Sequence, residues 1–419
     1  MVEPGHTLGG RKHDAHIAPV PRISLQAFCE SADLAATISD ATVDRRMDKA
    51  HIKVQMGGAP AAIEAYRNAP TPNVIVLESA GDRSELRRQL EELSEFCDSG
   101  TRVVVVGKTN DISLYRELMG LGVSEYLISP FAVIDFIEAI SNLYNADGHD
   151  HIGRLIAFIG AKGGVGASCI AHNVGWTIAR DLELQTVIAD FDLPFGTAGL
   201  DFNQDPPQGI AEAIYAPDRV DANLIDRLLS KCTDRLSLLA ASAMLDRTAD
   251  LDETAFDLVI DILRASVPAV ILDVPHMWTS WSKRVLTMAD EVVVVAGPDL
   301  ANLRNAKGLI DVLKAARPND RRPHVVLNGV GLLKRPEIDP SDFAKAVETE
   351  PLAAIPFDAK LFGTATNNGQ MIAEVDAANP IAAMVSDIAR VTMRRAEIKR
   401  VKKRLIPPIV ERFIKRKAS

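Results

Sequence analysis

Residues 155–168 read LIAFIGAKGGVGAS, an apolar run that passes directly into a glycine-rich loop. A helical pattern follows through Ile178, so a strand, a loop and a helix start come in that order. Such a loop points backbone N–H groups at an anion, and its glycines permit positive φ angles. The hydroxyl of Ser168 is placed to reach a magnesium ion. A tight turn between strand and helix is the alternative, but the context favours phosphate binding.

The loop departs twice from the common phosphate-binding pattern G-x-x-x-x-G-K-[ST]. Ala161 stands at the position of the first glycine, and Ala167 stands at the position of the lysine. That lysine would contact the β- and γ-phosphates, so its loss weakens both nucleotide affinity and transition-state stabilisation. Binding through backbone amides alone remains, and Lys162 lies elsewhere in the loop.

Two further motifs follow in the order seen in one known family. The run VIADFD ends at Asp192, and the run VILDVP contains Asp273. Together with Lys162 they resemble the deviant Walker family of ParA and MinD ATPases. The resemblance implies that Lys162 reaches across a nucleotide-sandwich dimer, that Asp192 orients the attacking water and that Asp273 holds Mg²⁺ through a water molecule. A single aspartate at a strand end is often only a helix cap, but three motifs in order favour the site.

The same resemblance extends to the nucleotide base. The strand VVLN ends at Asn328, which corresponds to the residue that reads the adenine edge, and IPFD places Pro356 beside the base. Gly329 follows Asn328 where the family commonly has Arg. The expected catalytic residues are Asp192 and Lys162, and the expected magnesium ligands are Ser168 and Asp273. The expected nucleotide contacts are Lys162, Gly163, Gly164, Val165, Gly166, Ala167, Ser168, Cys169, Asn328 and Pro356.

Short strand-like runs alternate with helical patterns along most of the chain, which predicts an α/β fold. Five alternations in 22–145 indicate a flavodoxin-like domain. A polar linker is predicted at 146–153, followed by a doubly wound, mostly parallel sheet of P-loop NTPase type in 154–390. A disordered leader at 1–21 and a basic tail at 391–419 complete the predicted organisation.

The first predicted domain resembles the receiver domain of response regulators, with its chemistry changed. Glu78 stands at the phosphoacceptor aspartate, the acidic pair is reduced to Cys29-Glu30-Ser31, and Ser129 replaces the lysine before Pro130-Phe131. Without the paired acids and the lysine, phosphotransfer is not expected. We interpret this domain as a pseudo-receiver used for docking or dimerisation; an unrelated flavodoxin-like domain is the alternative.

Composition limits the function classes. The four cysteines are scattered, which indicates neither a disulfide framework nor a zinc site, and no apolar run is long enough to span a bilayer, so we expect a cytoplasmic protein. The 26 residues from Arg394 hold 11 of the 47 basic residues and only two of the 56 acidic ones, which leaves the body at net −18. An acidic body argues against DNA as a partner. The basic tail suits an anionic membrane or an acidic partner, and a solvated end is equally compatible.

A degenerate receiver followed by an atypical ParA/MinD domain is the arrangement of the CpaE/TadZ family of Tad-type (Flp) pilus assembly proteins. The resemblance covers roughly 22–390 and implies an ATP- and Mg²⁺-binding hub that forms a homodimer on ATP binding and contacts the Tad secretion machinery. The resemblance also suggests a location at a cell pole or at the periphery of the inner membrane. Hydrolysis is expected to be weak or absent. The alternatives are an active partitioning-type ATPase that binds DNA or membrane, and a structural module with an empty site.

Overall fold

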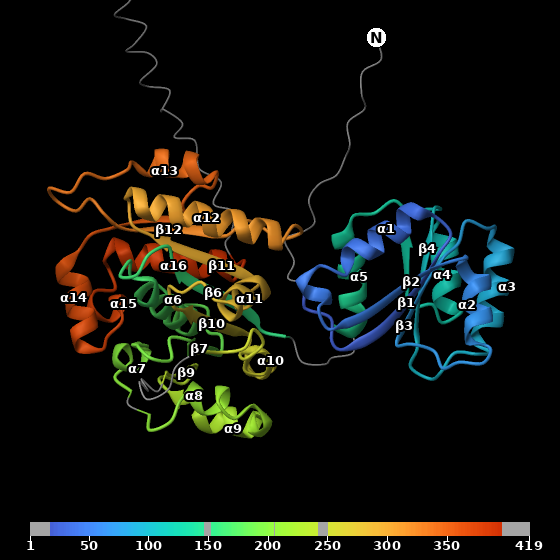
Figure 1. Cartoon of the computed structure of the whole chain (residues 1–419), viewed down its shortest axis with the longest axis horizontal. Coiled ribbons are helices and arrows are strands. Elements are labelled where there is room, and N and C mark those ends of the chain that lie inside the picture. Colours follow the sequence, from blue (N-terminus) through green and yellow to red (C-terminus); the bar gives the residue numbers. More distant parts are fainter. Residues whose placement is uncertain (1–16, 146–151, 205, 242–249, 396–419) are drawn as a thin grey trace, which may run out of the picture.

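The chain forms two α/β units, each built on its own sheet (Figure 1). The computed structural model describes residues 17–145, 152–204, 206–241 and 250–395. Most of the predicted leader (1–16), most of the linker (146–151) and most of the tail (396–419) therefore lie outside the described residues. Among the helices that are described, none is both long enough and apolar enough to cross a membrane.

The first unit has a five-stranded parallel sheet in the order β2-β1-β3-β4-β5, the strand order of flavodoxin-like folds. Its strands are Ile23–Cys29 (β1), Ala50–Met56 (β2), Val74–Glu78 (β3), Arg102–Gly107 (β4) and Glu125–Ile128 (β5). Its helices are Ala32–Ala41 (α1), Gly58–Tyr66 (α2), Arg83–Ser94 (α3), Ile112–Gly120 (α4) and Val133–Asn145 (α5), with a 3₁₀ turn at Arg45–Met47 (η1).

The second unit has an eight-stranded sheet in the order β13-β12-β11-β6-β10-β7-β9-β8, in which only the β8–β9 pair is antiparallel among the described strands. Its strands are Arg154–Gly160 (β6), Thr186–Asp190 (β7), Ser230–Lys231 (β8), Leu236–Leu239 (β9), Ala269–Val274 (β10), Glu291–Ala296 (β11), His324–Val330 (β12) and Ala353–Pro356 (β13). Its helices are Ala167–Asp181 (α6), Ala198–Asp201 (α7), Ile210–Ile214 (α8), Ala222–Leu228 (α9), Asp257–Ser266 (α10), Ser280–Met288 (α11), Leu300–Ala316 (α12), Pro340–Val347 (α13), Ala359–Asn368 (α14), Ile372–Val375 (α15) and Pro380–Thr392 (α16), with a 3₁₀ turn at Pro217–Arg219 (η2).

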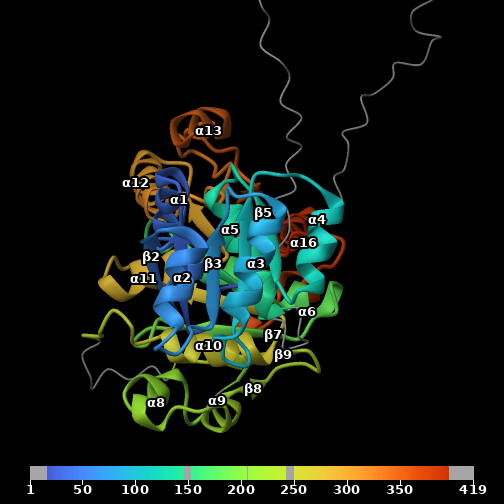
Figure 2. The same ribbon diagram turned by 90° about the vertical axis from the view of Figure 1, so that its right-hand side faces the viewer.

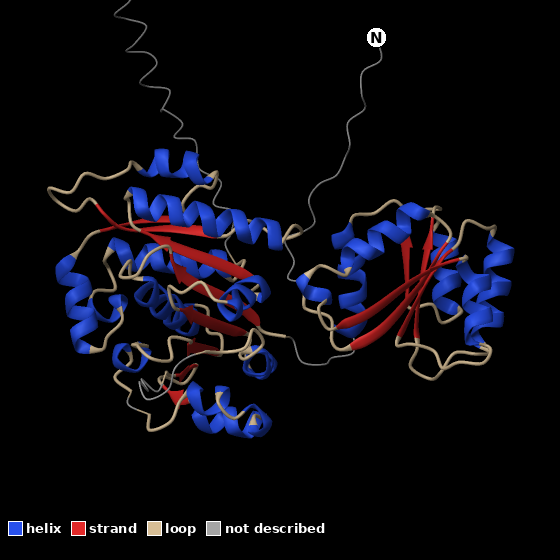
Figure 3. Ribbon diagram, in the orientation of Figure 1, coloured by secondary structure: helices blue, strands red, loops and turns tan. Residues whose placement is uncertain are grey.

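Helices cover both faces of each sheet (Figures 2 and 3). In the second unit, α6 and α16 pack on one face, and α10, α11 and α12 pack on the other. The central strands are buried on both faces, and for this reason they read in the sequence as continuous apolar runs, as in VILDV of β10. The predicted fold class, a flavodoxin-like unit followed by a doubly wound, mostly parallel P-loop NTPase sheet, is confirmed.

The strand order brings the three sequence motifs to one edge of the second sheet. Strand β10 pairs with β6 on one side and with β7 on the other, and Asp273 stands in register with Phe158 and Asp190. The glycine loop follows β6 and the D-x-D run follows β7. All three motifs therefore leave the carboxyl ends of neighbouring parallel strands, the usual place for a ligand in such sheets.

Candidate nucleotide-binding site

The glycine loop is built as an anion cradle at the start of α6. Gly164 and Gly166 adopt positive φ angles of 77° and 82°. Gly166 occupies the N-cap position of α6, and no side chain caps this helix. The first N–H groups of an α-helix have no partner within the helix, so those of α6 are available to an anion.

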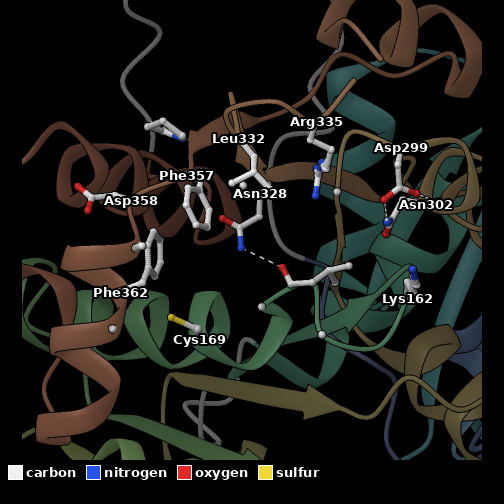
Figure 4. A pocket seen from close by; sticks show the side chains of 18 of the residues that line it. Lys162, Cys169, Asp299, Asn302, Asn328, Leu332, Arg335, Phe357, Asp358 and Phe362 are labelled. Atoms are coloured by element: carbon white, nitrogen blue, oxygen red, sulfur yellow. Dashed lines mark hydrogen bonds between the residues drawn. The ribbon is translucent and has the colours of Figure 1, made fainter. Parts of the chain in front are cut away.

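The loop forms the floor of a cavity of about 480 Å³. Figure 4 shows that the cavity has two chemically different ends. Phe357 and Phe362 lie at one end, where a planar base could stack, and Lys162 lies at the other end near Asp299. Between the two ends, Asn328 donates a hydrogen bond of 2.9 Å to the carbonyl oxygen of Val165. An aromatic end and a glycine-lined, cationic end suit a nucleoside phosphate.

The predicted contacts divide between this cavity and a neighbouring one. Those that line the first cavity are Lys162, Gly163, Gly164, Val165, Gly166, Cys169, Asn328 and Pro356. Ser168 lines an adjacent cavity of about 620 Å³, which also includes Gly166 and Cys169. Ala167, Asp192 and Asp273 line neither of these cavities. The structure thus brings eight of the ten predicted nucleotide contacts around one cavity. Asp192, predicted to orient water, and Asp273, predicted to hold magnesium, lie outside both cavities.

Asp192 is half-buried just beyond β7. Its Oδ1 accepts a hydrogen bond of 3.2 Å from the backbone N–H of Phe195. Burial, and secondarily the neighbouring charge of Asp273, raise the pKa of Asp192 above its ordinary value. A carboxylate of raised basicity is suited to accept a hydrogen bond from a water molecule.

Asp190, the first aspartate of the D-x-D run, was not among the predicted site residues. It is fully buried and accepts hydrogen bonds of 3.1 Å from the backbone N–H groups of Asp192 and Ala198. Burial and the nearby Asp273 raise the pKa of Asp190 to about 7. Asp190 therefore fixes the turn that carries Asp192, and its motif position was the signal in the sequence.

His172 was also missed from the sequence. The imidazole is fully buried on α6, with Nδ1 2.7 Å from Asp201 and Nε2 in an ion-pair contact of 3.3 Å with Asp273. It lies four residues after Ser168, so helical spacing places it on the same face of α6. His172 therefore lies between two carboxylates, hydrogen-bonded to Asp201 and in an ion-pair contact with Asp273.

A second cation, Arg335, lines the cavity from the loop after β12 and also escaped prediction. Burial alone would raise the pKa of Asp299, but hydrogen bonds from Asn302 and the charges of Lys162 and Arg335 lower it. Both cations therefore place positive charge near Asp299, and Arg335 also pairs with Glu337 at 3.5 Å. No motif marks Arg335, because its loop has no regular pattern.

The pseudo-receiver position Glu78 is tied down by its own fold. One carboxylate oxygen accepts from the backbone N–H groups of Glu30 (2.7 Å) and Ser31 (2.8 Å), and the other accepts from the Ser31 hydroxyl (2.6 Å). These groups belong to the start of α1, so the carboxylate is used for structure. The lack of phosphotransfer stays a prediction.

The residues present fit a nucleotide phosphate. The backbone cradle is complete, because the N–H groups at the start of α6 carry no side-chain cap, and Lys162 and Arg335 supply positive charge. A magnesium ion commonly takes one or two protein ligands and completes its shell with waters and phosphate oxygens. Ser168 and Asp273 are chemically suited to that role.

Comparisons with known proteins agree with this geometry. No family model matches the chain. Over 235 residues it is 25% identical to the septum site-determining protein MinD of Helicobacter pylori, covering 53% of this chain and 84% of that protein. The solved structure of a ParA family ATPase from Chlorobium tepidum TLS is 24% identical, with a TM-score of 0.52 and coverage of 57% of this chain and 98% of that chain. Fold and loop together define a P-loop NTPase fold of the ParA/MinD type.

A further relative is more similar in sequence. The pilus assembly protein CpaE of Caulobacter crescentus CB15 is 45% identical, covering 30% of this chain and 98% of that chain, with a TM-score of 0.30. A CpaE2 pilus assembly protein of Sinorhizobium meliloti 1021 is 36% identical over 29% of this chain. The identity across almost all of these relatives places the chain in the CpaE family of ParA/MinD-like proteins. The family predicted from the sequence is confirmed.

Proposed function

We propose that the protein is an ATP-binding switch that acts as a localisation and assembly hub for a Tad-type (Flp) pilus, with slow or no ATP hydrolysis. The observation that carries the proposal is a phosphate loop whose backbone cradle is complete but whose lysine position holds Ala167. The CpaE relatives, named as pilus assembly proteins, support the biological setting.

The proposed cycle depends on binding. ATP would rest its phosphates on the loop from Lys162 to Ser168, and its base would lie between Asn328 and the Pro356–Phe357 wall. Mg²⁺ held by Ser168 and Asp273 would neutralise phosphate charge. A ligand that prefers the dimer shifts the population toward it by its differential affinity, so turnover is not required for a switch.

Hydrolysis would be slow for a chemical reason. Asp192 would orient a water molecule toward the γ-phosphorus, and the P–O bond to the β-phosphate would then break, releasing phosphate and ADP. Negative charge spreads over the γ-oxygens in this transition state, and with alanine at position 167 no lysine there neutralises it. Preorganised positive charge at that point is usually worth orders of magnitude in rate.

The test is equilibrium binding of ATP with Mg²⁺ to the full chain, followed by phosphate release. Lys162→Ala should weaken ATP-dependent dimer formation. Ala167→Lys should tighten ATP binding at least about tenfold, because a charge-assisted hydrogen bond contributes about 1.5–3 kcal/mol. A lysine placed outside the site, Ala315→Lys on the exposed side of the last turn of α12, is the matched control and should leave binding unchanged.

Two outcomes would overturn the proposal. Failure of wild type to bind millimolar ATP would mean that the protein is a structural module. Sustained phosphate release that is abolished by Asp192→Ala would mean that the chain is an active ATPase despite Ala167. DNA retardation with a steep salt dependence would favour the partitioning-type alternative.

A further inference from the structure

The two units meet at the ends of their sheets that lie opposite the functional loops. On the first unit the contact is made by residues 44–49, which enclose η1 and precede the start of β2. On the second unit it is made by Asp290 and Asp320, which precede β11 and β12, and by Asp261 on α10. The first unit therefore sits beside the α11–α12 side of the second (Figure 1).

The centre of the contact is a buried arginine. The side chain of Arg45 is only 5% exposed. Its Nε donates to Asp320 Oδ2 at 2.7 Å, and its Nη1 donates to Asp290 Oδ1 and to the carbonyl of Met288, both at 3.1 Å. Arg46 also pairs with Asp320. Although burial alone would lower the pKa of Arg45, Asp290 and Asp320 raise it, so the guanidinium stays charged.

Peripheral pairs surround this centre. Lys49 Nζ lies 2.5 Å from Asp261 Oδ2, with both side chains about one-third to two-fifths exposed. Arg284 of α11 donates to Asp48 at 3.0 Å. Every one of these bonds joins a residue of the 44–49 segment to a residue more than 200 positions later in the chain.

In the described part of the chain, no apolar cluster spans the two units beside these pairs. The described residues form four apolar clusters, and each of the four lies wholly within one unit. Apolar burial is the main non-directional force that makes a contact between domains permanent, and polar contacts resemble transient interfaces. Asp290 and Asp320 each have a second arginine partner within their own unit, Arg264 at 2.8 Å and Arg317 at 3.0 Å, so neither carboxylate is left unpaired when Arg45 moves away. A contact held in this way depends on a few specific charges.

We propose that residues 44–49 form a releasable electrostatic latch that docks the receiver-like unit on the amino end of the NTPase-like sheet. The latch closes through Arg45 between Asp290 and Asp320, and it opens without unfolding either unit, since both cores are complete on their own. Because the phosphate loop and the Glu78 cluster leave the opposite, carboxyl ends of their sheets, the latch is independent of nucleotide binding. This inference goes beyond the proposed function and does not rest on it.

The test uses the full chain and a carbodiimide, which joins an amine to a carboxylate that touches it. In wild type at low salt, mass spectrometry should detect a Lys49–Asp261 cross-link, and small-angle X-ray scattering should give the compact radius of gyration of the docked form. Arg45→Ala should lower the cross-link yield at least tenfold and increase the radius. Arg83→Ala removes a charge from an exposed pair on the same unit and is the matched control.

A charge exchange keeps the test independent of folding defects. Lys49→Glu and Asp261→Lys each leave two like groups that the carbodiimide cannot join, so for these single variants the radius is the readout, and it should increase. The double variant, which restores the pair in reverse, should recover both the cross-link between positions 49 and 261 and the compact radius. A wild type that gives no Lys49–Asp261 cross-link, or an Arg45→Ala variant as compact as wild type, would overturn the proposal. ATP binding, measured on the same samples, should be the same in all variants. If wild type itself does not bind ATP, that result counts against the proposed function and leaves the latch proposal untouched.

Discussion

At the scale of single residues, His172 is the clearest departure from what a buried helix position normally holds. Burial alone would lower its pKa, but hydrogen-bonded Asp201 and neighbouring Asp273 outweigh burial and raise the pKa to about 10 from an ordinary 6.5. The folded-state pKa lies above the unfolded one. The stabilisation from His172 is therefore complete below pH 6.5 and is lost as the pH rises toward 10.

This shift predicts a pH-dependent stability in protein free of nucleotide and metal. Wild type should lose about 2 kcal/mol of unfolding free energy between pH 7 and pH 9, and His172→Asn should show little change over that range. Urea unfolding at stepwise pH measures both. His51→Asn, at an exposed histidine, is the control and should retain the wild-type slope. The same slope in His172→Asn would mean that the imidazole is not protonated in the folded state.

At the scale of elements, α6 depends on a close approach to the sheet. A Cβ atom at Gly175 would lie 2.7 Å from Cδ1 of Ile188, a fully buried side chain, and 3.3 Å from Cγ1 of Ile271. Gly308 of α12 has open space around the same point. The two helical glycines therefore differ in their roles. Gly175 allows α6, which carries the phosphate loop, to pack closely against β7 and β10, whereas Gly308 only weakens α12.

Alanine substitutions at the two glycines, Gly175 and Gly308, should change the free energy of unfolding in opposite directions. Gly175→Ala should lower the unfolding free energy by about 1–3 kcal/mol through overpacking. Gly308→Ala should raise it by about 0.5–1 kcal/mol, because alanine loses less backbone entropy in a helix. Urea unfolding of both variants beside wild type measures the difference. Equal signs would show that the helix can shift away from the sheet at Gly175.

The elements also show what sequence patterns can and cannot predict. Buried parallel strands such as β10 give continuous apolar runs, and the glycine loop gives a motif, so the fold and the loop residues that line the cavity were predictable. The two-residue strand β8 has too few residues for a pattern. Arg45 looks in the sequence like an ordinary solvated charge, and its partner Asp320 lies 275 residues away. Contacts at that separation leave no local signal. Arg335 was hidden for another reason, since its loop has no regular pattern.

At the scale of the whole molecule, the two functional edges face away from the contact between the units. The phosphate loop follows the carboxyl end of β6, while Asp290 and Asp320 precede β11 and β12 at the opposite end of the same sheet. A second copy can therefore approach the nucleotide edge without displacing the receiver-like unit. The receiver-like unit, in turn, keeps its Glu78 end free for another contact.

This arrangement predicts how dimer formation and docking combine. With ATP and Mg²⁺, light scattering should report twice the monomer mass, and X-ray scattering should show an elongated particle with the receiver-like units at its two far ends. Arg45→Ala should dimerise with the same ATP dependence but give a larger radius of gyration, because its receiver-like units are released. Lys162→Ala should form less dimer at the same ATP concentration, while its monomer keeps the compact, docked radius. An Arg45→Ala variant that no longer dimerises would mean that docking and nucleotide response are coupled through the sheet, since no residue of the latch lies at the nucleotide edge.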